Sequence, residues 1–218
     1  MNLDKLIGKH LTRYFDPSKT IPEETVQQLL RFLRSTPTSA NIQPNHFHVL
    51  ATPEAKERLA NNLGVGFDNN EKILNASHAI ILTTRADLPE SHLEAVFSKE
   101  RADGRFPDLA KQELRESMNR DFLDFLNLPH MYGYKDLNHW MEKQTYMAVG
   151  LTMMAAAELG VEAMPFEGFD PISVDKEFKI RETGHTTTVL MALGYPDPAK
   201  VNSGPISRFE SDQLFTFH

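Results

Sequence analysis

Apolar and polar residues alternate along the 218-residue chain with two periods, one typical of helices and one typical of strands. Apolar residues three and four apart predict helices over 2–10, 22–34, 54–62, 107–128 and 137–159. Short apolar runs predict strands over 46–51, 78–84, 161–166 and 186–193, with a further candidate strand over 214–217. Because strands and helices do not alternate strictly, the pattern favours an α+β fold over a doubly wound parallel sheet.

The two longest predicted helices have different patterns. On 107–128 the apolar residues form one stripe, which consists of Leu114, Met118, Phe122, Phe125 and Leu126. The helix over 137–159 is apolar nearly all round from 147 to 157, and Gly160 is placed to end it. A helix without a polar face is central to a fold or buried in a subunit interface.

Composition narrows the class of protein. Hydrophobic residues make up 40% of the chain and charged residues 24%, as in ordinary soluble globular proteins. There is no cysteine, which excludes disulfides, thiolate nucleophiles and cysteine-ligated metal centres. The formal net charge of −7 argues against general nucleic-acid binding. No secretory signal is visible, and the longest nearly uncharged apolar run, 145–157, is too short to span a bilayer, so we expect a cytoplasmic protein.

Two turns carry polar groups that can face a ligand. Residues 37–44 begin and end with proline, and two hydroxyls and two carboxamides lie between them. Such a rigid polar turn suits a flat heterocycle whose edge alternates donors and acceptors, although the same residues are common in ordinary turns. In the second turn, 164–170, Gly168 lets backbone N–H groups approach a ligand and Asp170 can cap the next helix. A plain strand-to-helix turn is the alternative there.

The charged and histidine side chains leave a ligand-binding role open. Lys9, Arg13, Lys72 and Arg208 could converge on one phosphorylated ligand or remain solvated surface charges. The histidines lack convincing metal-site spacing, so no metal site is predicted. Neither a catalytic carboxylate pair nor a nucleophile with its base is evident, and the glycine-rich dinucleotide and phosphate-loop motifs are absent.

Taken together, several segments resemble the FMN-dependent nitroreductase family, in particular its branch of oxygen-insensitive NAD(P)H nitroreductases, flavin reductases and dihydropteridine reductases. The resemblance covers nearly the whole chain. It rests, in this order and spacing, on 9–16 (KHLTRYFD), 37–44 (PTSANIQP), 69–72 (NNEK), 75–78 (NASH), 102–106 (ADGRF), 140–144 (WMEKQ), 165–170 (PFEGFD) and 207–208 (SR).

The resemblance implies a binding site for FMN. Lys9 and Arg208 are expected to face the phosphate, while Arg13, Lys72 and Asn69 are expected near the ribityl chain and the pyrimidine edge of the ring. A second subunit is expected to contribute the 37–44 loop to the same flavin, and the 165–168 turn is expected to form the wall behind the ring. The full implied set is Lys9, His10, Arg13, Pro37, Thr38, Ser39, Asn41, Asn69, Lys72, Gln144, Pro165, Phe166, Glu167, Gly168 and Arg208.

The same resemblance implies a fold, an assembly and an activity. The expected fold is nitroreductase-like, a single domain over 1–218 with a mostly antiparallel central sheet flanked by helices. Two chains are expected to form an intertwined homodimer that exchanges C-terminal strands. A hydride from NAD(P)H is expected to reach flavin N5, and a ping-pong mechanism would pass two electrons to nitroaromatics, quinones, flavins or dihydropteridines. No side chain is assigned a catalytic role, since flavin N5 would react and the Glu167 and Gly168 backbone would tune it.

The resemblance leaves several alternatives. Phe122 and Phe125 are expected to line the substrate mouth, with a place in the core as the alternative. A flavin reductase that supplies free reduced flavin is the alternative enzyme, a flavin-binding sensor or carrier without turnover is the alternative from another class, and a coincidental pocket is the third reading. Lys9, Leu11 and Ile206 depart from residues common in the family, so FMN is expected to bind less tightly than in close relatives. Asn45 also departs from the family and is expected to alter packing beside the 37–44 loop.

Overall fold

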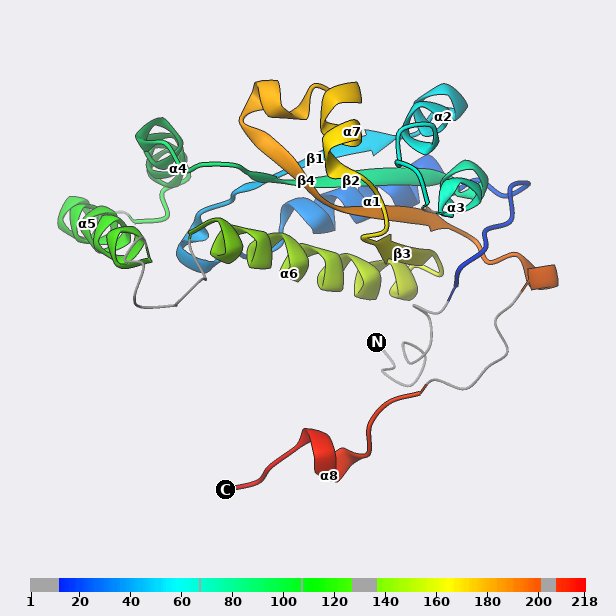
Figure 1. Cartoon of the computed structure of the whole chain (residues 1–218). Helices are drawn as coiled ribbons and strands as arrows, with labels where there is room; N and C mark the ends of the chain where they lie inside the picture. Colours follow the sequence, from blue (N-terminus) through cyan, green and yellow to red (C-terminus); the bar gives the residue numbers. More distant parts are fainter. Residues whose placement is uncertain (1–11, 67, 107, 127–136, 201–206) are drawn as a thin grey trace.

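The structure is a computed structural model that describes residues 12–66, 68–106, 108–126, 137–200 and 207–218, except for the side chains of 125 and 126. Its centre is an antiparallel sheet of four strands in the order β1-β2-β4-β3 (Figure 1). The strands are β1 (Asn45–Leu50), β2 (His78–Arg85), β3 (Glu162–Phe166) and β4 (His185–Gly194). All neighbouring pairs are antiparallel, and a register shift interrupts the β2–β4 ladder between Leu82 and Thr83.

Both faces of the sheet are buried, because side chains of the central strands alternate between two apolar clusters. Ala79 and Ile81 of β2 belong to one cluster, and Ile80 and Leu82 belong to the other. The first cluster is covered by α2 (Pro53–Ala60), α3 (Asn70–Asn75) and α7 (Pro171–Glu177). The second is covered by α1 (Glu23–Arg34) and α6 (Leu137–Glu158), and Figure 1 shows α6 on the opposite side of the sheet from α2, α3 and α7. This double burial explains the continuous apolar run of β2.

Two further helices stand beside the sheet rather than on it (Figure 1). They are α4 (Glu90–Ala102) and α5 (Leu109–Leu126), which pack together around Leu93, Phe97 and Leu123. Ile42 and the beginning of α6 join this third apolar cluster. Figure 1 also shows α8 (Ser211–Leu214) and the C-terminus lying apart from the sheet.

The segment around Phe15 is attached to the body next to the end of β4. Phe15 is 1% exposed and forms an isolated β-bridge with Pro196. Backbone hydrogen bonds of 2.9 and 3.0 Å flank this bridge. Gly194 permits the contact, because a Cβ at that position would lie 2.7 Å from the Phe15 ring.

Most of the predicted elements are confirmed within two residues. The structure contains the helices predicted over 22–34, 54–62, 107–128 and 137–159, and the strands predicted over 46–51, 78–84, 161–166 and 186–193. Gly160, with a φ of 73°, follows the end of α6 as expected. The helix predicted over 2–10 lies outside the described residues. Within the described ranges, no helix combines the length and apolarity needed to cross a membrane.

Three features differ from the sequence prediction. The candidate strand over 214–217 does not form within the described chain, because Leu214 ends α8 and residues 215–218 pair with no strand there. The expected exchange of this segment with a partner chain stays a prediction. The apolar stripe of α5 is wrong in part, since Leu114 and Met118 are 60% and 61% exposed whereas Leu123 is buried. The helices α3 and α4 were not predicted, because α3 is only six residues long and charged residues interrupt the apolar positions of α4.

Candidate functional site

Two segments separated by 99 residues meet beside β3. Asn69 precedes α3 and donates from Nδ2 to the backbone oxygen of Gly168 at 2.7 Å. Lys72 of α3 donates from Nζ to Asn69 Oδ1 at 2.5 Å. Asn69 is buried and Lys72 is half-buried, so the ammonium group is partly withdrawn from water. We call Asn69, Lys72 and the turn 165–168 the lysine cluster.

The position of α3 is set by α2. Lys56 of α2 donates from Nζ to the backbone oxygens of Leu74 and Ala76, at 3.1 and 2.5 Å. A cation there satisfies carbonyl groups that have no partner inside the helix. Asn70 donates to the backbone oxygen of Ala60 at 2.6 Å and joins the beginning of α3 to the end of α2. These contacts hold α3 at both ends. Burial lowers the pKa of Lys56.

The turn after β3 is closed by its own hydrogen bonds. The backbone N–H of Phe169 donates to the backbone oxygen of Glu167 at 2.9 Å. Asp170 then caps α7 by accepting from the N–H of Ile172 at 3.0 Å, as the sequence predicts. Hydrogen bonds from the Ser173 hydroxyl and from the N–H of Ile172 keep the pKa of Asp170 below its usual value. The turn is therefore fixed on the side where α7 begins.

Tyr146 of α6 reaches the same turn from the other face of the sheet. Its hydroxyl donates to Oε1 of the Glu167 carboxylate. Burial, together with this hydrogen bond and the charge of Glu167, raises the pKa of Tyr146, so the hydroxyl stays protonated at neutral pH. The carboxylate of Glu167 is thus joined to α6 by a neutral donor.

The loop 37–44 has a backbone conformation that few residues tolerate. Ala40, Asn41 and Gln43 have φ angles of 54°, 48° and 47°, in the left-handed region that favours glycine. A non-glycine residue in that region costs on the order of 1–3 kcal/mol unless its surroundings hold it there. The predicted polar turn is present, and it contains the short helix η3 (Ser39–Asn41). Its shape must therefore be supported by contacts as well as by the flanking prolines.

Side chains of α5 and α6 bind the backbone of this loop. Gln144 of α6 is 4% exposed and accepts through Oε1 from the N–H of Ser39 at 2.8 Å. Arg115 and Asn119 of α5 both donate to the backbone oxygen of Ala40, at 2.8 and 3.1 Å. Two of these contacts converge on a single carbonyl group, which orients the strained peptide.

A carboxylate of α4 completes these contacts. Glu100 is 5% exposed and accepts from Asn41 Nδ2 at 2.7 Å. Its charge is balanced by Arg115 at 3.4 Å and by Arg105 at 3.3 Å. A buried carboxylate is stable only with such partners, so Glu100, Arg115 and the loop form one connected group.

The remaining predicted cofactor residues are placed less closely. Lys9 and His10 lie outside the described residues, and Arg13 is exposed. Arg208 is also exposed and donates to the backbone oxygen of Ser207 at 2.7 Å, on the segment that Figure 1 shows apart from the sheet. Further along the set, Pro37 is exposed, Thr38 Oγ1 accepts from the N–H of Gln43 at 3.0 Å, and Pro165 and Phe166 end β3. One chain thus brings the residues of the lysine cluster together. It also joins Gln144 to the 37–44 loop, and these form a separate group.

The structure describes the side chain of only one of the two predicted substrate residues. Phe122 is half-buried in the apolar cluster of α4 and α5 and packs edge to face on Trp140, with ring centroids 5.7 Å apart. Within a single chain, Phe122 is therefore a core residue, which is the alternative to a place at the substrate mouth. Phe125 lies on α5, and its side chain is outside the described atoms.

Histidine rings gather near the beginning of β1 and β4. The ring centroids of His46 and His48 are 4.9 Å apart, and those of His46 and His185 are 5.6 Å apart. Burial lowers the pKa of His48 and of His185. In the part of the chain that the structure describes, no three histidine or acidic residues are arranged to hold a metal ion. On α4, burial also lowers the pKa of His92, whose Nε2–H donates to the backbone oxygen of Ile42 at 2.7 Å.

Several residues that hold the site were not identified from the sequence. Arg115 and Asn119 are four apart and share a face of α5, so a buried polar pair at helical spacing is the signal that could have identified them. Glu100 gave no such signal, because it is one of several charged residues near the end of α4. Tyr146 was hidden among the apolar residues of α6.

Comparisons with known proteins agree with this fold. The protein-family model described as "Nitroreductase family" matches residues 8–195 of the sequence. An oxygen-insensitive NAD(P)H nitroreductase of Salmonella typhimurium is 34% identical over 212 residues, which cover 96% of each chain. The major NAD(P)H-flavin oxidoreductase of Aliivibrio fischeri is 28% identical and covers 89% of this chain and 87% of the relative.

A solved structure extends the likeness to three dimensions. The nitroreductase of Exiguobacterium sibiricum determined in complex with FMN has a TM-score of 0.80, covers 100% of this chain and 98% of its own, and is 18% identical. At that identity the likeness concerns the fold alone, and the sequence matches identify the family. The chain belongs to the nitroreductase family and is an oxidoreductase of that type.

Proposed function

We propose that this protein is an FMN-dependent oxidoreductase that takes two electrons from NAD(P)H and gives them to small acceptors such as nitroaromatics, quinones, flavins or dihydropteridines. The observation that carries the proposal is the lysine cluster, in which a half-buried ammonium and a carboxamide are fixed against the turn after β3. The NAD(P)H-dependent relatives and the FMN complex of a structural neighbour support it.

The groups present fit a flavin. The pyrimidine edge of a flavin carries carbonyl acceptors and an N–H donor, and Lys72 and Asn69 offer a donor and a carboxamide that presents both kinds of group. The loop adds the exposed hydroxyl of Ser39 and the half-buried carboxamide of Asn41. The described residues of these two groups include no nucleophile with its base, which suits a reaction whose chemistry comes from a cofactor.

The residues would bind and tune the cofactor rather than react. FMN, when bound, would accept a hydride from NAD(P)H and then pass two electrons to the acceptor, with the two substrates occupying the same space in turn. Lys72 would hold a positive charge where reduction adds negative charge, which favours the reduced form. Gly168 leaves room for close approach to the backbone, while Asn69 fixes that backbone.

We further propose that the protein acts as a homodimer, in which the loop of one chain completes the lysine cluster of its partner. An exposed apolar face supports this assembly, because Phe32, Met147 and Met154 are 44%, 42% and 40% exposed. A groove of about 430 Å³ lies between α1 and α6 on this face. A second copy would cover it, and the C-terminal segment would pack on the partner through the exposed residues Phe209, Leu214, Phe215 and Phe217.

The visible spectrum of the protein tests this function. The protein is mixed with FMN, freed of excess flavin, and treated with NADH or NADPH without oxygen. We expect a yellow protein that is bleached by a nicotinamide and regains its colour when a quinone or nitroaromatic is added. A protein that stays colourless after reconstitution would contradict the proposal, and a coloured protein that no nicotinamide bleaches would be a flavin carrier.

A second candidate function is a flavin reductase that releases reduced flavin, and the Aliivibrio fischeri relative favours it. The two enzymes differ in their preferred acceptor. Turnover with free FMN that greatly exceeds turnover with quinones and nitroaromatics would select the flavin reductase, and the reverse order would select the nitroreductase.

A further inference from the structure

We infer that Glu100, Arg115 and Asn119 are positioning residues that hold the loop 39–43 in its left-handed conformation, and that FMN affinity depends on that conformation. The first half of the inference concerns the protein alone. The second half rests on the proposed function, because it assumes that the loop contacts FMN. All three residues belong to the α4–α5 pair, which means the two helices α4 and α5 together.

The loop needs support from outside itself. Three of its five residues have positive φ angles and none of the five is glycine, so a free segment of this sequence would favour other conformations. Within the loop, the N–H of Ile42 donates to the backbone oxygen of Ser39 at 3.2 Å, and the exposed Gln43 Nε2 donates to the backbone oxygen of Asn41 at 3.2 Å. Exposed bonds of this kind exchange readily with water and hold a strained backbone weakly.

The outside support is centred on the backbone oxygen of Ala40. Arg115 Nη2 and Asn119 Nδ2 approach this oxygen at 2.8 and 3.1 Å and occupy both of its lone pairs. Asn119 is 4% exposed, and the side chain of Arg115 is 17% exposed. Because donors withdrawn from water need replacement partners, they favour the one loop conformation that brings this carbonyl to them.

Glu100 links the neighbouring loop residue to the same arginine. Its Oε1 accepts from Asn41 Nδ2 at 2.7 Å and lies 3.4 Å from Arg115 Nη2. Arg105 approaches the same oxygen at 3.3 Å. Two adjacent residues of the loop, both with positive φ angles, are thus held by one connected group of charged and amide side chains.

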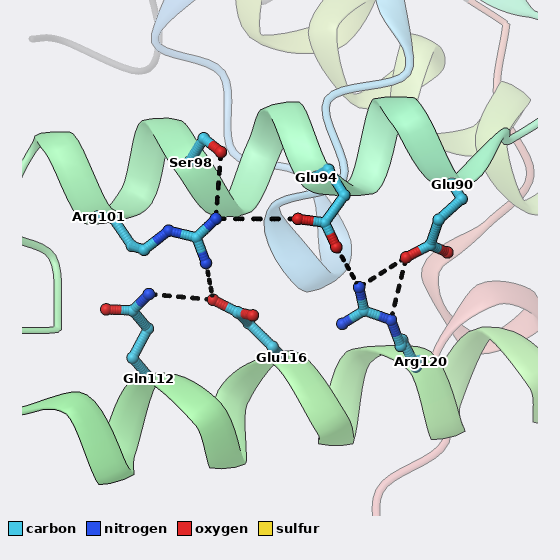
Figure 2. Close-up of polar contacts among 7 residues, drawn as sticks. All are labelled: Glu90, Glu94, Ser98, Arg101, Gln112, Glu116 and Arg120. Atoms are coloured by element: carbon cyan, nitrogen blue, oxygen red, sulfur yellow. Dashed lines mark hydrogen bonds and ion pairs between the residues drawn. The ribbon is translucent and has the colours of Figure 1, made fainter.

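A separate ladder of ion pairs, made by other residues, holds the α4–α5 pair together (Figure 2). Arg120 pairs with Glu90 at 2.6 Å and with Glu94 at 2.5 Å. Arg101 pairs with Glu116 at 2.5 Å and lies 3.8 Å from Glu94. These side chains bind the neighbouring helix, whereas Arg115 binds both the neighbouring helix and the loop. The ladder therefore offers a matched control.

The test compares Arg115→Met with Arg120→Met. Both replace an arginine of α5 by the same residue, and both remove ion pairs to α4. Amide hydrogen exchange at 39–43 is measured in the apoprotein, and the Kd of FMN is measured by quenching of flavin fluorescence. We expect Arg115→Met to speed exchange and weaken FMN binding, each about tenfold or more. We expect Arg120→Met to change both by less than about twofold.

Two more variants separate positioning from general stability. Asn119→Leu keeps the side-chain shape but removes one donor to Ala40, so it should weaken FMN binding by about three- to tenfold. Arg115→Lys keeps a cationic donor but loses the rigid fork of the guanidinium, so it should recover part of the affinity that Arg115→Met loses. Thermal unfolding of each apoprotein reports the loss of stability that is common to all variants.

The outcomes divide cleanly. Equal losses of FMN affinity in Arg115→Met and Arg120→Met, or unchanged loop exchange in Arg115→Met and Asn119→Leu, would overturn the inference. Faster loop exchange confined to the Arg115 and Asn119 variants upholds the positioning role even if the unaltered protein binds no FMN. An unaltered protein that binds no FMN would refute the proposed function but would leave the positioning role intact.

Discussion

The lysine cluster and the 37–44 loop are both candidate contacts to one cofactor, yet they are held in place by different means. The lysine cluster lies where β3 leaves the sheet, and its backbone is fixed by the sheet, by α2 and by the cap of α7. The loop is strained, and buried side chains of α4, α5 and α6 hold it. Side chains hold both regions, but only the loop has to be held against backbone strain, so the loop is the region that a single substitution is expected to release.

The largest effect is expected from separating the two chains, if the loop of one chain meets the lysine cluster of its partner only in the dimer. Met154→Glu places a carboxylate in the groove between α1 and α6, and burying that charge should weaken dimerisation by roughly 100-fold. FMN binding should be lost wherever the variant is monomeric, since each chain would offer half of the site. Sedimentation velocity and FMN titration at one protein concentration measure both effects.

A matched control for this experiment is Val65→Glu, because Val65 is fully exposed on a loop. It should leave dimerisation and FMN affinity unchanged. A monomeric Met154→Glu protein with unaltered FMN affinity would show that one chain holds the complete site.

The next effect concerns the lysine cluster alone. Lys72→Met removes the half-buried charge, so the midpoint potential of bound FMN should fall by about 30–60 mV, which corresponds to the loss of one charged hydrogen bond for a two-electron couple. Loop exchange should stay as it is, because the loop is held by other residues. Lys176→Met, at an exposed position of α7, is the control, and equal potentials in the two variants would exclude this role for Lys72.

A smaller effect is expected at the link between the turn and α6. Tyr146→Phe removes the hydroxyl that donates to Glu167, and FMN should bind about two- to threefold more weakly because the turn loses one exposed hydrogen bond to a carboxylate. Flavin titration measures the change. Tyr14→Phe, at an exposed ring, serves as the control and should bind FMN normally. If both variants bind equally well, the backbone alone fixes the turn.

The smallest effect is a pH dependence that belongs to the loop. Burial lowers the pKa of His92 in the folded protein, so the unfolded chain takes up the proton first as the pH falls. Stability that is complete above the ordinary histidine pKa is therefore lost as the pH falls through that value and toward the lowered one. His92→Gln keeps an N–H donor for Ile42 but cannot titrate in this range.

Urea unfolding and loop exchange at pH 7.5, 6.5 and 5.5 measure this effect. The His92→Gln protein should lose less stability on acidification, and its loop should open less. A pH dependence equal to that of the unaltered protein would assign the effect to other half-buried histidines, such as His48 and His185.

The sheet body could be predicted from the sequence because its signals are local. Buried strands produce continuous apolar runs, and α1 and α6 produce apolar positions at helical spacing. The α4–α5 pair could not be predicted equally well, because the buried face of α5 depends on its partner helix. Leu123, which is not in the predicted stripe, faces α4, while Leu114 and Met118 of the stripe remain exposed. The order of strands in the sheet also has no local signal.

The candidate site divides in the same way. The polar loop, the glycine turn and Lys72 stand out because their residue types and neighbours are unusual over a few positions. The residues that hold the loop pair with it over sequence separations of 50 and more, as between His92 and Ile42, Glu100 and Asn41, or Asn119 and Ala40. No local pattern encodes such a pairing, and the positive φ angles at Ala40 and Asn41 are invisible in a segment without glycine.

The bridge between Phe15 and Pro196 holds two distant parts of the chain at one point beside the sheet. Arg13 lies two residues before Phe15, and Arg208 lies twelve residues after Pro196. A ligand bound by Arg13 and Arg208 of one chain would therefore close the polypeptide into a ring through that ligand.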